Sequence, residues 1–370
     1  MIADTLRDRI RSGGPISIAA FMTEALFDPR HGFYATKDPI GAGADFITAP
    51  EISQMFGELI GLVAAQTWLD MGRPDGFKLI EMGPGRGTMM SDALRAARTV
   101  PGFMDATEIV LIEASAALKA VQAQTLGPSG AQIRWIDRLD AVAPGPSFIV
   151  GNEFLDCLPV RQALRHKGEW HERLVGLAPT DKSAGKSAGE SEFVFVLGPP
   201  LGQDADLVPA RLQDADDGAL VELRPGDRQV VDQLAERFSD QPGRALFIDY
   251  GPATSEIGDT LQAIRAHKKQ PPLQEPGTAD LTARVDFESL IQAGRSAGLT
   301  SHGPQTQGRW LTELGLEARA AVLSQSQPGK RSEIARQIWR LTDTEQMGEL
   351  FKLVCLDSAD LPPPPGFSAG

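Results

Sequence analysis

The feature that most constrains the fold is a short apolar run that breaks into alternating glycines, Leu-Ile-Glu-Met-Gly-Pro-Gly-Arg-Gly-Thr at residues 79–88. Residues 77–82 are typical of a buried parallel strand, and residues 88–97 have the apolar spacing of a helix. The sequence therefore predicts a strand, a tight turn and a helix. At such a turn the glycines allow a ligand to approach the backbone, and the helix start offers unpaired N–H groups.

The spacing of the glycines indicates which ligand the turn binds. A phosphate-binding loop ends in Gly-Lys followed by Ser or Thr, and no Lys follows Gly87, so that loop is excluded. The dinucleotide fingerprint places its third glycine three residues after the second. Gly83, Gly85 and Gly87 are two apart, which weakens an assignment to NAD or FAD. With Glu81 two positions before the first glycine, the pattern resembles motif I of the class I S-adenosylmethionine (SAM) methyltransferases. A turn that only caps a helix remains the alternative.

Two acids follow the next predicted strands. Residues 108–113 form a second apolar strand that ends in Glu113, and one crossover helix fits between it and the glycine turn. An acid at the end of the adjacent strand can bind both ribose hydroxyls, so Glu113 is a predicted cofactor ligand, with an exposed strand-end Glu as the alternative. Asp137 follows a short strand at residues 133–136, and it would either meet the adenine amino group or act as a cap.

Composition and charge limit the class of protein. At 370 residues, 42% of them hydrophobic, the chain can bury a large core, and we expect one elaborated domain. The formal net charge of −13 argues against a nucleic-acid partner and mildly favours a basic one. Two far-separated cysteines, Cys157 and Cys355, suit a reducing compartment and cannot form a four-cysteine metal site, and we expect no metal. The sequence shows neither a membrane-spanning apolar run nor a secretory signal, which predicts a soluble, intracellular protein without membrane insertion.

Four ordered segments together resemble a known family: residues 45–58, 80–88, 152–160 and 280–287. Over nearly its whole length the sequence is similar to the class I methyltransferases typified by the mitochondrial complex I assembly factor that methylates a protein arginine. The resemblance implies SAM (S-adenosyl-L-methionine) as cofactor, an arginine of a protein substrate as acceptor, and a respiratory complex I subunit as target. The expected location is the bacterial cytoplasm, with the mitochondrial matrix as the alternative. Ala44 departs from the family pattern, which has Gly before Asp45, so the path of that loop stays open.

Three polar residues, Asn152, Glu153 and Asp156, follow the predicted fourth strand at residues 147–151. Open α/β sheets bind substrates at this edge. A guanidinium is cationic and delocalised, with a pKa above about 12, so paired carboxylates would be needed to localise its charge and orient one nitrogen. We therefore predict that these three residues are catalytic. A helix start capped by Asn152 is the alternative, and Cys157 is interpreted as a buried thiol.

The predicted architecture is an α/β, Rossmann-like class I methyltransferase fold. It has a seven-stranded sheet, an N-terminal helical and loop cap, and an inserted β-hairpin lid. The predicted parts are an N-terminal cap (1–70), a SAM-binding core (71–160), an inserted lid (161–243), the C-terminal half of the core (244–360) and a disordered or extended tail (361–370).

Local patterns predict several elements outside the core. In the lid, residues 161–166 and 169–177 alternate as in a hairpin, and the Lys- and Ser-rich residues 179–191 predict a mobile loop. Helices are predicted at 16–26 with Ser17 as cap, at 51–69, at 260–269, and after Asp286 as cap. The second of these is expected to turn Met55, Leu59, Leu62, Val63 and Leu69 toward the sheet. Residues 300–305 and 350–356 are predicted to form an antiparallel edge of the sheet.

The loop at residues 45–54 is predicted to close over SAM and to help form the acceptor channel, because it is flanked by glycines yet carries apolar residues. The predicted cofactor ligands are Thr48, Pro50, Ser53, Glu81, Gly83, Pro84, Gly85, Gly87, Glu113 and Asp137. Two rival functions stay open: methylation of a small molecule on the same fold, and a non-catalytic assembly chaperone that keeps SAM as a structural ligand. The sequence makes no prediction of the oligomeric state.

Overall fold

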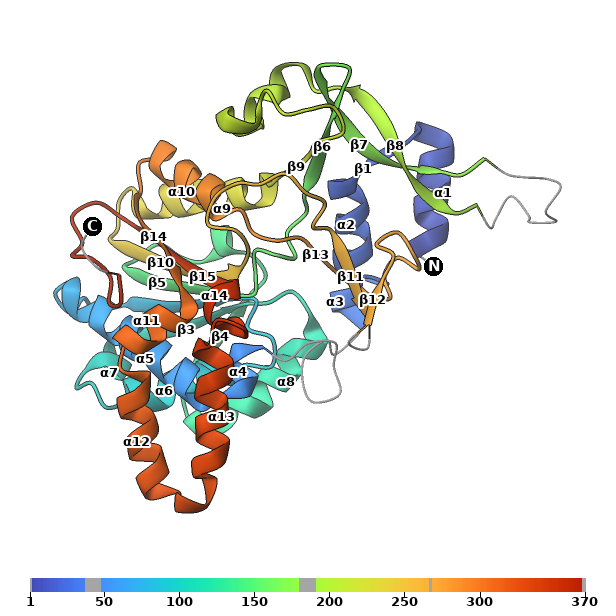
Figure 1. Cartoon of the computed structure of the whole chain (residues 1–370). Coiled ribbons are helices and arrows are strands. Elements are labelled where there is room, and N and C mark those ends of the chain that lie inside the picture. The colour runs from blue at the N-terminus through green and yellow to red at the C-terminus, as the bar shows by residue number, and fades with distance from the viewer. Residues whose placement is uncertain (1, 37–47, 180–190, 266–267, 368–370) are drawn as a thin grey trace.

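The computed structural model describes residues 2–36, 48–179, 191–265 and 268–367, and its centre is a mixed β-sheet (Figure 1). Within these residues the sheet has seven strands in the order β14-β15-β10-β5-β2-β3-β4. Their bounds are β2 Phe77–Met82, β3 Thr107–Ile112, β4 Ile133–Ile136, β5 Ser147–Asn152, β10 Gly243–Tyr250, β14 Thr300–Thr306 and β15 Phe351–Asp357. Strands β4, β3, β2, β5 and β10 run parallel, while β15 is antiparallel to both β10 and β14. The predicted seven-stranded sheet with an antiparallel edge is confirmed.

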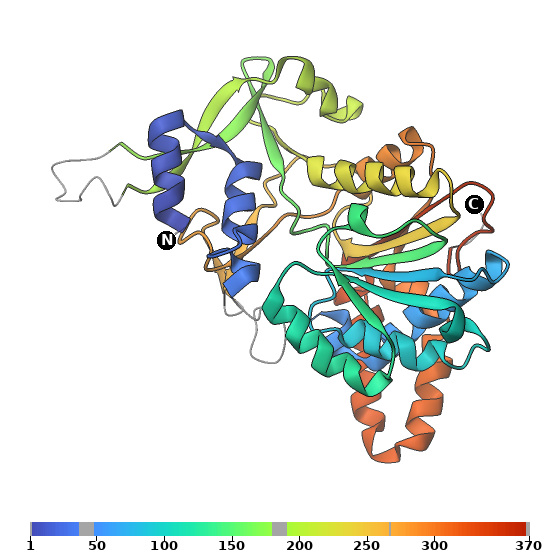
Figure 2. The same ribbon diagram turned by 180° about the vertical axis from the view of Figure 1, so that it is seen from behind.

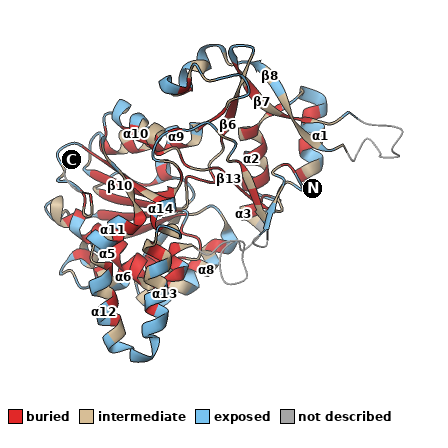
Figure 3. Cartoon of the chain, in the orientation of Figure 1, coloured by how far each residue is buried: buried red, intermediate tan, exposed pale blue. Residues whose placement is uncertain are grey.

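Both faces of this sheet are buried, because successive residues of each strand point to opposite sides. In β2, Leu79 belongs to one hydrophobic cluster and Ile80 to the other. The helices on the side of Leu79 are α5 (Gln54–Asp70), α6 (Thr88–Ala97), α8 (Ala116–Leu126) and α11 (Gln307–Glu313), and those on the side of Ile80 are α9 (Pro225–Phe238) and α10 (Phe287–Ser296) (Figure 3). The strands are thus packed on both faces, and polar side chains lie mainly at their ends.

A second body, made from three separate stretches of the chain, packs beside the main sheet (Figure 2). Its elements are α1 Ile2–Gly13, β1 Ile16–Ser17, α2 Ile18–Phe27, α3 Phe33–Thr36, β6 Arg161–His166, β7 Glu169–Leu177, β8 Phe193–Pro200, β9 Leu220–Leu223, β11 Gln262–Arg265, β12 Lys268–Gln270 and β13 Asp280–Thr282. One hydrophobic cluster contains Phe21, Val175 and Leu281 and therefore joins all three stretches. The division of the chain into cap, core and inserted lid stays a proposal.

Several local predictions are confirmed. Strands β6 and β7 form the predicted hairpin. Ser17 caps α2, since its Oγ accepts a hydrogen bond from Ala20 N at 3.1 Å. Asp286 caps α10 in the same way, through Ser289 N at 3.0 Å. Residues 180–190, which make up most of the predicted mobile loop, lie outside the described residues.

The helix predicted at residues 260–269 is wrong. Strands β11 and β12 occupy this stretch and pair with each other, and β11 also pairs with β13. Leu261 and Ala263 are buried, whereas Gln262 and Ile264 are less so, which is the two-residue period of a strand. Pairing with β13 therefore overrides the local helical propensity. Residues 266 and 267 lie outside the described residues.

The helix predicted at residues 51–69 is interrupted. Helix α4 (Ala49–Ile52) ends at Ser53, which is extended with φ −154°, and α5 begins at the next residue. Ser53 Oγ accepts from Met55 N at 3.3 Å, so it caps the second helix. Met55, Leu59 and Val63 are buried as expected, and Leu69 packs partly buried against the core. The expectation for Leu62 is wrong, since it is 41% exposed.

Residues 361–367, predicted as an extended or disordered tail, form neither helix nor strand and pack against the core. Arg244, which is fully buried, donates a hydrogen bond to Pro362 O, and Trp310 Nε1 donates to Pro365 O at 3.0 Å. Phe367 is only 8% exposed. Prolines restrict the free chain, so docking this segment loses less conformational entropy than docking a flexible one. Residues 368–370 lie outside the described residues.

Candidate cofactor and acceptor site

The predicted site residues gather where the parallel strands end. The glycine turn follows β2, Glu113 follows β3, Asn152 ends β5, and Asp249 is the penultimate residue of β10. The carboxyl ends of parallel strands meet at one edge of a sheet, and ligands of open α/β folds bind there. The structure therefore brings the predicted cofactor and acceptor residues to the same edge.

The glycine turn requires glycine for both conformation and space. Gly83, Gly85 and Gly87 have φ of 66°, 52° and 79°, in the left-handed region that other residues rarely adopt. The turn is closed by a hydrogen bond from Gly87 N to Pro84 O at 2.7 Å. A Cβ atom at Gly83 would lie 3.1 Å from the ring of Phe154. Gly83 is exposed, whereas Gly85 and Gly87 are buried where the turn leads into α6.

Glu81 is buried within β2, with 2% of its surface exposed. Its Oε2 atom has no hydrogen-bond partner among the described residues. Burial raises the pKa of the Glu81 carboxyl to about 8. An unpaired buried acceptor is costly, so this residue suits a ligand that brings a donor to it, such as the ammonium group of SAM.

Glu113 is held in place by a glutamine that the sequence analysis did not identify. The Glu113 carboxylate accepts from Ser115 N at 2.8 Å and from Gln122 Nε2 at 3.0 Å. Gln122 is fully buried in α8, and its Nε2 also donates to Gly85 O at 2.8 Å. Its Oε1 accepts from Trp135 Nε1 at 2.8 Å. Gln122 therefore fixes the glycine turn and Glu113 at a set spacing, and burial raises the pKa of Glu113.

The segment with Thr48, Pro50 and Ser53 lies beside the glycine turn. Thr88 Oγ1, at the start of α6, donates to Glu51 Oε1 at 2.6 Å. The N–H of Ala49, which precedes Pro50, hydrogen-bonds to the Glu153 carboxylate. This bond partly opposes the rise in the pKa of Glu153 that burial causes. This segment therefore touches both the cofactor turn and the acceptor end. Residues 45–47 of the predicted closing loop lie outside the described residues.

Asp137 lies further from this arrangement. It follows β4, with 69% of its side chain exposed, and its Oδ1 accepts from Lys119 Nζ at 2.6 Å. Asp137 lies at a strand end as predicted, but its carboxylate already forms an exposed ion pair with Lys119. Its contact with adenine stays a prediction.

Asn152 and Glu153 form an unusual corner at the end of β5. Glu153 has a φ of 50°, which is uncommon for a residue with a side chain, and its N–H donates to Ile248 O at 2.9 Å. Asn152 Nδ2 donates to Glu153 Oε1 at 3.3 Å, while Asn152 Oδ1 has no hydrogen-bond partner among the described residues. Burial and the nearby Asp156 raise the pKa of Glu153 to about 8. Such backbone strain is common at functional sites.

Asp156 and Asp249 complete the acidic end of the main sheet. Asp156 is 6% exposed and Asp249 is fully buried. Asp249 Oδ2 accepts from Leu155 N at 3.0 Å and from Asp156 N at 3.1 Å, so it holds the loop that carries the predicted catalytic residues. Burial raises the pKa of Asp156 to about 6, and burial together with Asp156 raises the pKa of Asp249 well above its usual range. Among the described residues, no three His, Cys, Asp or Glu side chains are arranged to hold a metal ion.

The second body lies next to this acidic end. Tyr34 OH donates to Asp280 Oδ1 at 2.8 Å, and Tyr250 OH donates to Thr282 Oγ1 at 2.8 Å. Ala283 N donates to Asp156 O at 2.9 Å, which ties the end of β13 to the loop that carries the predicted catalytic residues. The loop that carries the predicted catalytic residues thus contacts the second body through the end of β13.

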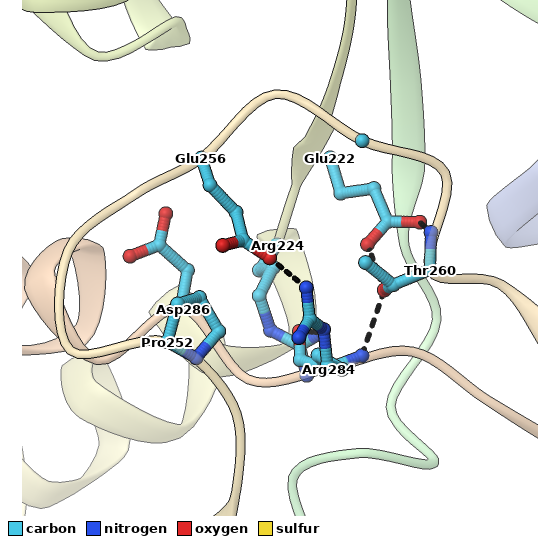
Figure 4. Close-up of a pocket in the computed structure, with 8 residues that line it drawn as sticks. Glu222, Arg224, Pro252, Glu256, Thr260, Arg284 and Asp286 are labelled. Carbon is cyan, nitrogen blue, oxygen red and sulfur yellow. Dashed lines mark hydrogen bonds and ion pairs between the residues drawn. The ribbon is translucent and has the colours of Figure 1, made fainter.

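Arg224 connects the loop after β5 with the segment after β13. Its side chain is 3% exposed and pairs with Asp227 at 2.6 Å. It also donates to Leu155 O at 2.6 Å and to Arg284 O at 3.0 Å, so one guanidinium holds both the loop after β5 and the segment after β13. Figure 4 shows Arg224 at a small hollow that is lined by Glu222, Arg224, Pro252, Glu256, Gly258, Thr260, Arg284 and Asp286. This hollow contains none of the predicted cofactor or catalytic residues.

Comparison with known proteins identifies the family. A family of S-adenosyl-L-methionine-dependent methyltransferases matches residues 59–305. The chain belongs to this family. Protein arginine methyltransferase NDUFAF7, mitochondrial, from Danio rerio is 34% identical over 369 residues, which cover 94% of this chain and 84% of that protein. The protein of the same name from Homo sapiens is 33% identical over 374 residues, covering 94% and 81%.

A solved structure agrees with this assignment. The Burkholderia thailandensis protein crystallised with S-adenosyl-homocysteine superposes with a TM-score of 0.85 at 29% identity, covering 100% of this chain and 95% of that one. The predicted class I methyltransferase fold, enzyme class and SAM cofactor are confirmed. In the described part of the chain, no helix is long and apolar enough to cross a membrane. The roles of individual residues stay predictions.

Proposed function

We propose that this methyltransferase transfers a methyl group from SAM to an arginine side chain of a protein substrate. The observation that carries the proposal is the acidic end beside the glycine turn, where Glu153, Asp156 and Asp249 lie at the ends of β5 and β10. Carboxylates bind a guanidinium bidentately and with defined geometry. The names of the Danio rerio and Homo sapiens relatives, protein arginine methyltransferase, support the same acceptor.

The cofactor half of the site would bind SAM through three features. SAM supplies an electrophilic methyl group on a sulfonium cation. The backbone of the glycine turn would let SAM lie close to it. Glu113 would accept hydrogen bonds from the ribose hydroxyls, and Glu81 would accept one from the ammonium group. Since a nearby cation favours the ionised form of a carboxyl, the ligand would also lower the raised pKa of Glu81.

The acceptor half would bind and deprotonate the guanidinium. Glu153 and Asp156 localise its positive charge, so that one nitrogen keeps its lone pair for the methyl group. Methylation of that nitrogen releases one proton. Without a ligand the pKa of Glu153 is raised to about 8. A bound guanidinium would favour the ionised carboxylate, which could then accept the proton, and Asn152 would orient it through the 3.3 Å hydrogen bond.

The proposed target, a subunit of respiratory complex I, rests on the sequence resemblance. Mass spectrometry of methylated arginines in cells with and without the gene tests it. We expect one or a few arginines of a complex I subunit to lose methylation without the gene. Unchanged protein methylarginine, together with a methylated small molecule that disappears, would replace the protein acceptor with a small one.

The chaperone alternative makes a different prediction from the enzyme. A gene copy that encodes Glu153→Gln should fail to restore the methylation if the acidic end is catalytic, although the protein still binds SAM. Full restoration of complex I by this copy, with no restored methylation, would favour the chaperone. The compartment is also proposed, either the bacterial cytoplasm or the mitochondrial matrix, and the relatives are named as mitochondrial proteins.

A further inference from the structure

We infer that Trp135 and Gln122 are positioning residues of the cofactor site, which hold the Glu113 carboxylate ready for the ribose hydroxyls of SAM before SAM binds. The inference rests on the contact proposed between Glu113 and the ribose, and it deepens that proposal. It gives a tryptophan of β4 and a glutamine of α8 a part in selecting the ligand, although neither side chain is proposed to touch it. The alternative is that the glutamine only joins α8 to the sheet.

Gln122 is buried at the point where α8 packs on the glycine turn. Its Nε2 atom uses both N–H donors, one on Gly85 O at 2.8 Å and one on the Glu113 carboxylate at 3.0 Å. A Cβ atom at Gly87 would lie 3.6 Å from the Cα atom of Gln122, so the backbone of α8 lies against the turn as well. One fully buried amide therefore contacts both of the features that are proposed to bind SAM.

Trp135 decides which way the amide of Gln122 faces. The indole N–H can only donate, and Trp135 Nε1 donates to Gln122 Oε1 at 2.8 Å. If the amide turned by 180°, its oxygen would face Gly85 O and the Glu113 carboxylate, and its N–H groups would face the indole N–H. All three hydrogen bonds would be lost together at a buried position, so only one orientation is stable.

This orientation matters because it fixes the acid that follows β3. Glu113 Oε1 accepts from Ser115 N at 2.8 Å and Glu113 Oε2 accepts from Gln122, so both carboxylate oxygens are held. Glu113 is only partly buried, and an ionised carboxylate has about four acceptor positions, so a ligand hydroxyl can still bind it. A side chain that is already oriented loses little entropy when the ligand binds, and it requires the ligand hydroxyls at set places.

The test measures ligand binding in the absence of any acceptor. Calorimetry gives the Kd of S-adenosyl-homocysteine and the Kd of its analogue without the ribose 2′-hydroxyl, and the ratio of the two measures how well the site selects the ribose. Gln122→Met keeps the length of the side chain but removes the amide, and Trp135→Phe removes the indole N–H. The controls are the same changes at exposed positions, Gln66→Met on α5 and Trp339→Phe on α13 (Arg331–Thr342).

We expect wild type to bind S-adenosyl-homocysteine ~10-fold or more tightly than the analogue, because the analogue lacks a hydrogen bond to a charged group. Gln122→Met should raise the Kd of S-adenosyl-homocysteine ~5- to 30-fold and reduce the ratio to about three or less. Trp135→Phe should act in the same direction, with a rise of ~3- to 10-fold, because the amide can then turn. Gln66→Met and Trp339→Phe should behave as wild type.

A pH series adds a second measurement on the same variants. The hydrogen bond from Gln122 lowers the pKa of Glu113 and so opposes the effect of burial. Without this bond the carboxylate takes up a proton at a higher pH. On acidification, the affinity of Gln122→Met for S-adenosyl-homocysteine should therefore begin to fall at a higher pH than that of wild type, whereas Gln66→Met should follow wild type.

Glu113→Ala separates this inference from the proposal on which it rests. If Glu113→Ala loses the preference for S-adenosyl-homocysteine while Gln122→Met and Trp135→Phe keep it, Glu113 binds the ribose and the two positioning roles are overturned. If wild type binds both ligands equally, the ribose contact and the positioning roles are overturned together. An equal rise in both Kd values for Gln122→Met would mean that Gln122 only supports the fold, which also overturns the inference.

Thermal melting checks that each variant is folded. If Gln122→Met is unfolded, the ratio measured for Trp135→Phe decides the inference alone. Since no acceptor takes part in these measurements, their outcome is independent of whether the enzyme methylates arginine.

Discussion

The two halves of the site differ in how they are built. In the cofactor half, Glu81, the glycine turn and Glu113 come from two neighbouring strands and the helix between them. In the proposed acceptor half, the loop with Asp156 is held by distant stretches of the chain: Asp249 of β10 accepts from its N–H groups, and Ala283 of the second body donates to Asp156 O. The first half depends on local backbone geometry, and the second depends on the fit between two bodies. A change at the contact between the bodies should therefore damage the acceptor site and spare SAM binding.

The largest effect is expected at Arg224, which connects the loop after β5 with the segment after β13. Arg224→Ala leaves the buried Asp227 without its cation, and breaking a buried pair in this way costs about 3–5 kcal/mol. We expect the free energy of unfolding in urea to fall by about that amount. Arg228→Ala is the control, because Arg228 forms an exposed pair with Asp232 on the same helix and should cost less than about 0.5 kcal/mol. Equal stability of the two variants would contradict the inference that Arg224 holds the loop after β5 to the segment after β13.

Glu153→Gln should separate the halves by their kinetics. The variant keeps size and most hydrogen bonding but removes the charge that holds and deprotonates the acceptor, so kcat should fall by ~10²-fold or more. Affinity for SAM, measured by calorimetry, should stay within about threefold. Asp156→Asn should act similarly, and the double variant should lose less than the sum, since both residues hold one group. Glu169→Gln, an exposed change on β7, is the matched control. Full activity of Glu153→Gln on an arginine peptide would remove the carboxylate mechanism.

Glu113→Ala should give the opposite pattern. It removes the contact proposed for the ribose hydroxyls, and SAM binding should weaken by about 1.5–3 kcal/mol, the range for a hydrogen bond to a charged group. At saturating SAM, kcat should be nearly unchanged. Gln122→Ala should also weaken SAM binding, but less, because it removes the brace and not the ligand contact. A fall in kcat with normal SAM affinity would mean that Glu113 serves the acceptor half.

The smallest effect concerns the pH dependence of stability at Glu81. Burial raises its folded-state pKa from 4.5 to about 8, so as the pH rises the unfolded chain loses this proton first. Without cofactor, wild-type stability should therefore fall between about pH 4.5 and 8, and Glu81→Gln should lack this contribution. Thermal melting from pH 5 to 8 should show the variant gaining a few degrees on wild type, on the order of 1 kcal/mol or more. A difference that is constant with pH would show that Glu81 is not protonated in the folded state.

The same contrast explains which parts of the site could be predicted. The glycine turn and Glu113 follow from spacing along the chain, because a strand, a turn and a helix constrain one another locally. Asp249 lies at a strand end like Glu113, so its position was a usable signal. Tyr34 and Asp280 gave no such signal, since their contact depends on packing across 246 residues. Gln122 sits mid-helix, where the sequence pattern does not distinguish a brace from an ordinary polar residue.

The helix wrongly predicted at residues 260–269 has the same physical origin. This stretch becomes a strand because it pairs with β13, a partner that a local pattern does not contain. The tail also depends on distant partners, since Pro362 and Pro365 accept hydrogen bonds from Arg244 and Trp310, and the sequence left two states open for it. A local pattern does not decide the structure of segments whose partners lie far along the chain.

The contact between Tyr34 and Asp280 also sets an order of events during synthesis. Tyr34 leaves the ribosome early, and its partner is made 246 residues later. At about 5–20 residues per second, Tyr34 waits roughly 10–50 s for the strand that carries Asp280. The strands of the cofactor half, up to β5, are all made before then. During synthesis the contact between the N-terminal helices and β13 is therefore among the later ones to become possible, and it forms only after the strands beside the glycine turn exist.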